Sequence, residues 1–250
     1  MKKILLLLTS LAIFLLAISC SGIVIAAEIK NQNRDCVVML HGLLRHSDSM
    51  EKIAHKLRDE KKFTVLNLDY PAPKFRIEEL IEIIHPQISE FEKKCEGRLN
   101  FVAHSIGGLV TRAYIHKFHP KNLGKVVMLG TPNQGSEEAD VASKLFLVKD
   151  WYKKVYGPAG AELITDQSQF KNIFGEVSYE LHIIAGNLSR DPLAWIIFKS
   201  ENDGKVTVDR TKLDGMKSHT VFKVDHGSML VDDAVIERVG RVLMPAEASS

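Results

Sequence analysis

Short apolar runs alternate with amphipathic segments along most of this chain, and this alternation limits the folds that it can adopt. The apolar runs that we predict to be strands are 36–40, 63–68, 99–103, 125–129, 181–185 and 220–224. Apolar residues with helical spacing lie between and after them, at 49–60, 77–95, 106–118 and 232–243. Strands that are apolar on both faces and joined by amphipathic helices predict an α/β fold with a mostly parallel sheet covered on both sides.

Three places in this pattern are less regular. Pro86 lies inside the predicted helix 77–95, which it should kink or divide because proline has no N–H to donate. No strand is evident over 131–179, where a partly apolar stretch at 141–155 has helical spacing. The short run 206–209 begins either a loop or a helix. Because active sites of parallel sheets gather at the carboxyl ends of the strands, we expect the functional residues directly after each strand.

The N-terminus has the layout of a targeting segment. A short positive start precedes an almost wholly apolar run over 4–18, as in a secretory signal peptide. We therefore assign 1–27 to a signal peptide and expect an extracytoplasmic protein, periplasmic or secreted. Two alternatives keep it at a membrane: lipidation of Cys20, or an uncleaved anchor, since about 20 apolar residues can span a bilayer. The remaining residues, 28–250, are predicted to form one domain.

A serine stands at the corner between a predicted strand and a predicted helix. The residues Ala103-His104-Ser105-Ile106-Gly107-Gly108 join these two elements directly. Such a turn holds a serine hydroxyl clear of the sheet at a helix N-terminus, and small neighbours keep its strained backbone free of clashes. The usual pattern is G-x-S-x-G, and Ala103 replaces its first glycine with another small residue. We predict that Ser105 is a nucleophile; a capping serine is the alternative.

The residues after strand 36–40 are the second constellation. A serine nucleophile requires backbone N–H groups that bind the developing oxyanion, and the N–H groups of Leu43 and Ile106 are our candidates for this oxyanion hole. Gly42 allows the chain to turn closely at this point. We interpret His41 as a residue that orders the loop by hydrogen bonding, with a role as a base as the alternative.

These motifs resemble the bacterial lipase and esterase branch of the α/β-hydrolase superfamily, whose members include triacylglycerol lipases. The resemblance rests on the motifs at 40–43, 103–108, 129–136 (Leu-Gly-Thr-Pro-Asn-Gln-Gly-Ser), 157–160 (Gly-Pro-Ala-Gly) and 202–206 (Asn-Asp-Gly-Lys-Val). It extends over about 37–243 and departs from the family pattern at Ala103. It implies an α/β-hydrolase fold and hydrolysis of lipid-like or acyl esters without a cofactor.

A serine nucleophile of this kind needs a histidine base and a carboxylate, in the chain order Ser, Asp, His. Among the ten histidines, His226 fits best, because it follows the predicted strand 220–224 on a loop with Gly227 and Ser228. His219, which precedes the same strand, is the alternative. In this hypothesis His226 takes the proton of Ser105, and an acyl-serine forms that water then releases.

The carboxylate that would orient His226 is assigned to Asp203. It lies in Asn202-Asp203-Gly204, a turn that presents a carboxylate rigidly, and it matches the family's block at 202–206. The alternatives are Asp191, Glu137 and Asp140, the last two if the acid lies one strand earlier. Asp225 adjoins His226, but neighbours on an extended chain point apart, so we interpret it as a loop charge.

Two cysteines remain after the leader, Cys36 and Cys95. In the fold that the resemblance implies, the strands near them are parallel neighbours, so both cysteines lie at the edge away from the site. We predict a disulfide between them, with two free thiols as the alternative. No Cys and His cluster has metal-ligand spacing, so we expect no catalytic metal. A net charge of +2 without a basic block predicts no nucleic acid partner; the sequence carries no signal for the oligomeric state.

The segment 136–179 lies where this superfamily inserts caps. Its apolar and aromatic residues over 145–156 predict a small lid that lines an acyl pocket, or alternatively a helix that covers the core. The apolar run 193–198 extends that pocket or forms a surface that meets a lipid interface. We therefore predict a lipase or carboxylesterase. An acyltransferase or thioesterase would use the same triad, and a non-catalytic binding protein on this scaffold would lack one of its members.

Overall fold

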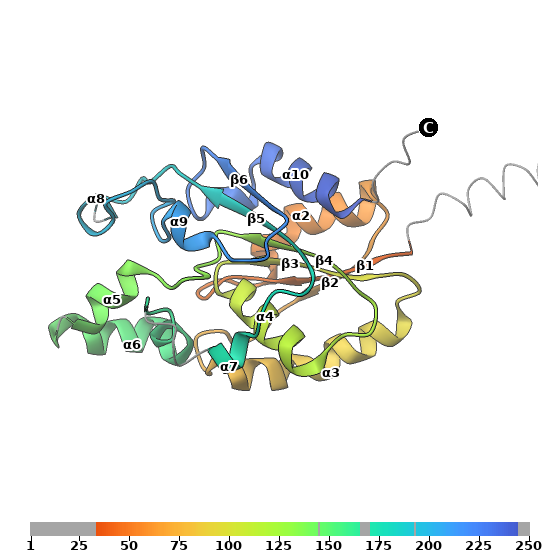
Figure 1. The fold of residues 1–250 in the computed structure, drawn as a ribbon, viewed down its shortest axis with the longest axis horizontal. Helices are drawn as coiled ribbons and strands as arrows, with labels where there is room; N and C mark the ends of the chain where they lie inside the picture. Colours follow the sequence, from red (N-terminus) through yellow and green to blue (C-terminus); the bar gives the residue numbers. More distant parts are fainter. Residues whose placement is uncertain (1–33, 145, 166–170, 193, 245–250) are drawn as a thin grey trace, which may run out of the picture. The chain divides into compact units, whose positions relative to one another are not determined.

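The computed structural model describes residues 34–144, 146–165, 171–192 and 194–244. Their centre is a six-stranded sheet in the order β2-β1-β3-β4-β5-β6 (Figure 1). Every neighbouring pair of strands is parallel. The strands are β1 Cys36–Leu40, β2 Thr64–Leu68, β3 Leu99–His104, β4 Leu123–Leu129, β5 Glu180–Gly186 and β6 Ser218–Phe222. The predicted α/β fold with a parallel sheet is confirmed.

The order of the strands places a crevice between β1 and β3. The chain runs from β1 outward to β2 and then returns to β3 on the other side of β1. Connections therefore leave the carboxyl ends of β1 and β3 in opposite directions, which is where ligands bind in open α/β sheets. Leu40 pairs with Ala103 in the register of these strands, so the segments that follow them, at 41–43 and 104–106, lie side by side.

Two layers of helices cover the sheet (Figure 1). On one face lie α3 Ile77–Lys94 and α4 Ile106–Phe118, and on the other lie α2 Glu51–His55, the π turn η2 Lys56–Glu60 and α10 Asp233–Leu243. Successive strand residues enter opposite layers: Val37 and Val102 belong to one buried cluster, Val38 and Phe101 to the other. This explains why apolar residues occur on both faces of the central strands.

Two helices differ in detail from their predictions. Pro86 does not divide helix α3, which is continuous over 18 residues. Its apolar face, including Leu80, Ile81, Ile84 and Ile88, is buried on both sides of Pro86, and this packing outweighs one lost hydrogen bond. The predicted helix 49–60 is three short pieces: a 3-10 turn, η1 Ser47–Met50, followed by α2 and η2.

The last strand also differs from its prediction. β6 covers Ser218–Phe222 rather than 220–224, because this strand lies at the edge of the sheet and most of it is half-buried, so the apolar pattern does not mark its bounds. Val224 instead belongs to the buried core as a loop residue. The short run 206–209 leads into helix α9 Val208–Thr211, whose first turn is capped by the Thr207 hydroxyl. A 3-10 turn, η4 Ser228–Leu230, precedes α10.

Between β4 and β5 the chain forms α5 Glu137–Lys144, α6 Phe146–Ala161 and α7 Lys171–Phe174. Helix α6 bends at Gly157, which has a positive φ of 66°. Helix α8 Ala194–Ile197 follows β5. Most of the described residues of the predicted insertion 136–179 are therefore helical. None of the helices in the described residues is both long and apolar enough to cross a bilayer.

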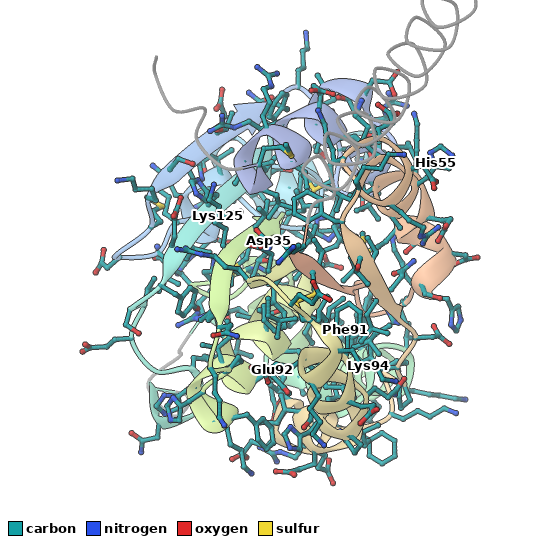
Figure 2. All side chains as sticks on the ribbon, turned by 90° about the vertical axis from the view of Figure 1, so that its right-hand side faces the viewer. Asp35, His55, Phe91, Glu92, Lys94 and Lys125 are labelled. Carbon is teal, nitrogen blue, oxygen red and sulfur yellow. A yellow bond between two sulfur atoms is a disulfide. The ribbon has the colours of Figure 1, made fainter. Side chains whose placement is uncertain are left out.

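The amino edge of the sheet carries a disulfide. Cys36 at the start of β1 is bonded to Cys95 at the end of α3, with their Cα atoms 5.9 Å apart. Figure 2 views the molecule from this side, where Asp35 and Lys125 are labelled. The predicted leader, 1–27, lies outside the described residues and stays a prediction, as does lipidation of Cys20.

Candidate active site

Ser105 occupies a strained turn between β3 and α4. Its backbone angles, φ 55° and ψ −127°, are rare for a residue with a side chain. The turn persists because the Ser105 N–H donates to the Leu129 carbonyl at 2.8 Å and its carbonyl accepts from Gly108 at 3.0 Å. Gly107 must be glycine, since a Cβ there would lie 2.5 Å from the Leu40 carbonyl oxygen. Helix α4 can thus start directly against the end of β1.

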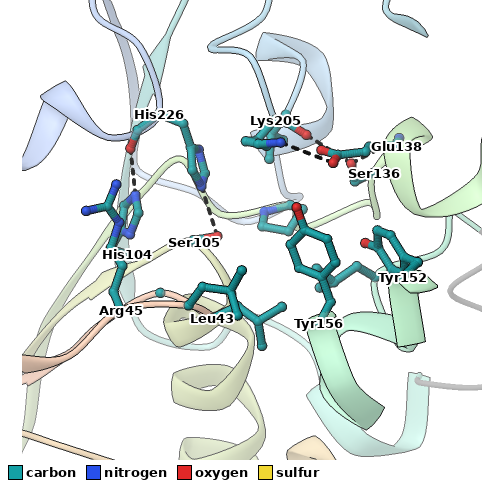
Figure 3. A pocket seen from close by; sticks show the side chains of 15 residues that line it. Leu43, Arg45, His104, Ser105, Ser136, Glu138, Tyr152, Tyr156, Lys205 and His226 are labelled. Atoms are coloured by element: carbon teal, nitrogen blue, oxygen red, sulfur yellow. Dashed lines mark hydrogen bonds and ion pairs between the residues drawn. The ribbon is translucent and has the colours of Figure 1, made fainter. Parts of the chain in front are cut away.

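The side chains of Ser105, His226 and Asp203 form one continuous chain of hydrogen bonds. The Ser105 Oγ lies 3.0 Å from His226 Nε2, and His226 Nδ1 lies 2.7 Å from Asp203 Oδ2 (Figure 3 shows the first of these bonds). Because an ionised carboxylate only accepts hydrogen bonds, Nδ1 carries the imidazole proton and Nε2 accepts from the serine hydroxyl. The structure thus brings together the three side chains that the sequence nominated.

Backbone groups hold Asp203 in place. Its carboxylate is buried, and Oδ1 accepts from the N–H groups of Lys205 at 2.9 Å and Val206 at 2.8 Å. The His226 N–H donates to the Asp203 carbonyl at 2.8 Å, so the two loops are also joined through their backbones. Space for this pair is left by Gly130, where a Cβ would lie 3.0 Å from Asp203 Oδ2. The Asn-Asp-Gly turn therefore presents its carboxylate rigidly.

The alternative acids and base lie in other contacts. His219 Nε2 bonds the Thr211 hydroxyl at 2.8 Å, and Glu137 pairs with Arg210 at 3.0 Å. Asp140 accepts from the Thr165 N–H, and Asp191 lies 3.9 Å from Lys205. Asp225 does more than supply loop charge: its Oδ1 accepts from the N–H groups of Gly227 and Ser228, which shapes the turn that carries His226.

His104 is a functional residue that our sequence reading missed. It is buried beneath His226, and its Nε2 donates to the His226 carbonyl at 2.9 Å. Burial holds the pKa of His104 well below its ordinary value, so the ring is neutral. Its Nδ1 is buried without a hydrogen-bond partner. The signal in the sequence was a polar residue at the end of an otherwise apolar strand.

His41 orders the loop after β1, as interpreted from the sequence. Its Nδ1 donates to the Gly42 carbonyl at 2.8 Å, and Nε2 accepts from the Tyr70 N–H at 3.3 Å. Burial lowers the pKa of His41, which agrees with a neutral ring in these contacts. The Tyr70 hydroxyl donates to the His41 carbonyl at 2.7 Å, and the two rings stack. The loop is thereby fixed against Ser105.

The two residues whose N–H groups were nominated for an oxyanion hole lie near Ser105. Ile106 opens helix α4, and Leu43 lines the same cavity as Ser105. Among the described residues, neither N–H donates to another group of the protein. A Cβ on Gly42 would lie 3.2 Å from the Ser105 Cβ, so the backbone before Leu43 passes close to the nucleophile. Both donors are thus available to a bound oxygen.

A cavity of about 390 Å³ opens above Ser105 (Figure 3). Its tyrosine side is built by Tyr152 and Tyr156 of α6 and by Leu163, so the predicted insertion does line a pocket. Lys205 and Glu138 form an ion pair of 3.1 Å across its upper rim. The remaining lining residues are Gly42, Leu43, Leu44, Arg45, His104, Pro132, Ser136, Val206 and His226. The run 193–198 contributes no lining residue among those described, and Ile196 is exposed.

Metal binding finds no support in the part of the chain that the structure describes. No group of three or more His, Cys, Asp or Glu side chains there is arranged to hold an ion.

A parallel sheet with a strained serine between β3 and α4 defines this chain as a member of the α/β-hydrolase superfamily, and solved structures agree. A Bacillus licheniformis lipase in its mature form is similar with a TM-score of 0.70 and 20% identity, over 84% of this chain and 92% of that one. A Legionella pneumophila phospholipase has a TM-score of 0.64 and 14% identity, over 84% and 59%. A Paleococcus ferrophilus monoacylglycerol lipase is similar with a TM-score of 0.54 and 17% identity, over 85% of this chain and 93% of that one. At these identities the similarity shows the fold.

The family follows from the sequence. Residues 36–193 match the model of the palmitoyl protein thioesterase family, and the chain belongs to that family. The match includes Ser105 and ends before Asp203 and His226. No curated protein matches this sequence. Family and fold together make this chain a hydrolase enzyme, as predicted.

Proposed function

We propose that this chain is a serine hydrolase that cleaves acyl esters or thioesters, with Ser105 as nucleophile, His226 as base and Asp203 as the acid that orients it. The observation that carries the proposal is the hydrogen-bonded chain from Ser105 Oγ through both ring nitrogens of His226 to a buried carboxylate. A serine hydroxyl is a weak nucleophile unless a neighbouring base takes its proton. The floor of the cavity presents this arrangement to a bound molecule.

The reaction follows from the protonation states. His226 Nε2 accepts the Ser105 proton while Oγ bonds to the acyl carbon, and the carbonyl oxygen becomes an oxyanion. The imidazolium then gives that proton to the departing oxygen or sulfur, and the acyl-serine remains. Water, deprotonated by the same nitrogen, attacks the acyl-serine and releases the acid. Asp203 stabilises the imidazolium in both halves.

Two neighbouring groups assist these steps. The N–H groups of Leu43 and Ile106 stabilise the oxyanion, a contribution of about 3 to 4 kcal/mol for each donor of this kind. His104 is a positioning residue: its hydrogen bond to the His226 carbonyl keeps the base above Ser105. The oxyanion donors are backbone N–H groups, so the side chains at positions 43 and 106 are expected to matter little for this contribution.

The acyl group occupies the side of the cavity that Tyr152, Tyr156 and Leu163 line, because this wall offers aromatic and aliphatic surface. A cavity near 390 Å³ lies at the small end of ligand sites, which run from about 300 to 1,000 Å³. This size favours short and medium acyl chains. The family's description favours a thioester as the natural substrate, and an acyltransferase remains the alternative with the same nucleophile.

The protein's location is a further part of the proposal. The disulfide between Cys36 and Cys95 supports an extracytoplasmic protein, because disulfides persist in oxidising compartments. The leader 1–27 supports the same location, with either cleavage or membrane anchoring at the N-terminus. Fractionation of expressing cells, followed by N-terminal sequencing of the mature chain, tests this. Reduced cysteines in a cytosolic fraction would contradict it.

The central experiment is labelling with a fluorophosphonate, which reacts only with an activated serine. We expect stoichiometric labelling at Ser105, and none in Ser105→Ala or in the denatured protein. Ser178→Ala, which removes an exposed hydroxyl that does not line the cavity, serves as the matched control and keeps its label. Matched p-nitrophenyl esters and S-acyl thioesters of increasing chain length then identify the preferred bond and acyl group. Labelling at another residue would overturn the assignment.

A further inference from the structure

Arg45 lies on the opposite side of Ser105 from the tyrosines. It belongs to the loop after β1 and lines the cavity together with Ser105, His104 and His226. Figure 3 shows its side chain beside His104 and below His226. A Cβ added to Gly227 would lie 2.7 Å from Arg45 Nη2, so the guanidinium packs against the residue that follows the base. A positive charge is therefore held close to the reaction centre.

This charge has no partner in the part of the chain that the structure describes. The other ionised groups that line the cavity, Lys205 and Glu138, neutralise each other at 3.1 Å. Asp225, in the loop that carries His226, accepts from Gly227 and Ser228 and pairs with Arg190 at 3.4 Å. His104 is neutral for the reason given above. Arg45 consequently leaves one wall of the cavity positive, whereas the tyrosine wall is apolar.

The chemistry of the proposed reaction says which part of the substrate meets Arg45. The leaving group takes its proton from His226 Nε2, so it departs on the side of His226. Arg45 lies on that side, next to the His226 loop, and the acyl group lies against the tyrosines. The guanidinium matches carboxylates and phosphates, which it binds through paired N–H donors.

We infer that the substrate's leaving group is anionic, with a carboxylate or phosphate within a few bonds of the scissile sulfur or oxygen, and that Arg45 binds it. This inference rests on the proposed function and adds the charge of the leaving group to it. The acyl chain and the leaving group are thus recognised by opposite walls, one apolar and one cationic.

A charge series with a constant acyl group tests the inference. S-butanoyl thioglycolate is anionic, S-butanoyl thioglycolamide is neutral, and S-butanoyl thiocholine is cationic. For the wild type we expect kcat/KM to fall in that order, by about fivefold at each step, as for one ion pair at a partly exposed site. The preference should weaken as salt is raised, because exposed charges are screened. Arg45→Gln should abolish the preference, and Arg45→Glu should reverse it.

Controls separate charge recognition from intrinsic reactivity and from damage. Each ratio is compared between wild type and variant, so differences in thioester reactivity cancel. Arg98→Gln removes the same charge from an exposed residue before β3, at the opposite edge of the sheet, and should keep the wild-type order. The ratio of kcat/KM for butanoyl glycerol 3-phosphate to that for butanoyl glycerol tests the same charge preference with an oxyester that carries a phosphate.

The outcomes are distinct. A preference that depends on Arg45 in either pair supports the inference and identifies the kind of leaving group. Hydrolysis of the neutral substrates without a charge preference, or with one that survives Arg45→Glu, overturns it while the proposed function stands. No hydrolysis of any substrate, together with no labelling of Ser105, would instead overturn the proposed function.

Discussion

The two edges of the sheet differ in how well their polar groups are bonded. At the amino edge, the side chains of Asn100 and Lys125 and the Cys36–Cys95 disulfide connect neighbouring elements with satisfied bonds. Asn100 is buried and bonds the Cys36 carbonyl at 3.1 Å and the Lys125 N–H at 2.7 Å. Lys125 Nζ caps the end of α10 through the Val242 and Met244 carbonyls.

The energetically unfavourable features around the active site lie at the carboxyl edge. Ser105 has a strained backbone, and His104 has a buried nitrogen without a partner. Arg45, which lines the cavity, forms no salt bridge with another described residue. Such features cost free energy and persist only where the surrounding structure stabilises them. The amino edge therefore contributes stability to the fold, whereas the carboxyl edge contains features that cost stability and serve the active site. Changes at the carboxyl edge should therefore reduce activity, and changes at the amino edge should reduce stability.

The sharpest test is Asp203→Asn at the carboxyl edge. The amide keeps an oxygen for the Lys205 and Val206 N–H groups, but it favours the wrong tautomer of His226. We expect kcat to fall about 10⁴-fold with little loss of stability. Steady-state kinetics and thermal unfolding measure the two effects. Asp191→Asn is the control and should lose little activity; a loss below tenfold in Asp203→Asn would contradict the assignment.

The matching test at the amino edge removes the disulfide. The double variant Cys36→Ala, Cys95→Ala should lose about 4 kcal/mol in the free energy of unfolding, because the cysteines close a loop with a sequence separation of 59. Urea unfolding measures the loss. The kcat of the folded variant should stay within about twofold of the wild type, if the edges are independent. A large fall in kcat at a temperature where the variant is folded would break the comparison.

A pH series tests the strain at His104. Burial lowers its folded-state pKa, so below about pH 6.5 the unfolded chain binds a proton that the folded chain does not. Stability should therefore fall as the pH falls through this range, by up to about 1.4 kcal/mol per pH unit for this residue. His104→Gln should reduce that slope in urea unfolding between pH 7 and 5. His55→Gln, which replaces an exposed side chain of α2, is the control for the substitution. Equal slopes in all three proteins would refute the account.

The smallest effect is expected where α5 meets the carboxyl edge. Glu138→Gln removes the carboxylate that pairs with Lys205 at 3.1 Å. Because both groups are partly exposed, the loss should be about 1 kcal/mol or less, seen as a change in KM rather than kcat. Glu137→Gln, whose partner is Arg210, is the control for charge on the same helix. A change in kcat as large as that of Asp203→Asn would show that α5 belongs with the catalytic edge.

Strand-end chemistry was readable from the sequence because it depends on short local patterns. Ser105 between β3 and α4, and Asp203 in its Asn-Asp-Gly turn, are marked by small residues at fixed spacing. The role of His104 could not be predicted from the sequence, because it depends on a carbonyl 122 residues further along the chain. The place of Arg45 in the cavity could not be predicted for the same reason: nothing near it in sequence shows that it lies beside the His226 loop. A local rule predicted that Pro86 would kink or divide its helix, and the helix is not divided because packing on both sides of Pro86 stabilises it.

By itself, the sequence determined the alternation of strands and helices, the parallel sheet and the positions of the candidate nucleophile, acid and base, because each of these is encoded within a few neighbouring residues. The tertiary structure alone decided that a buried neutral histidine supports the base and that one wall of the cavity is apolar and the other cationic. Those properties depend on burial and on distances between groups from different loops, and both arise only when the chain packs.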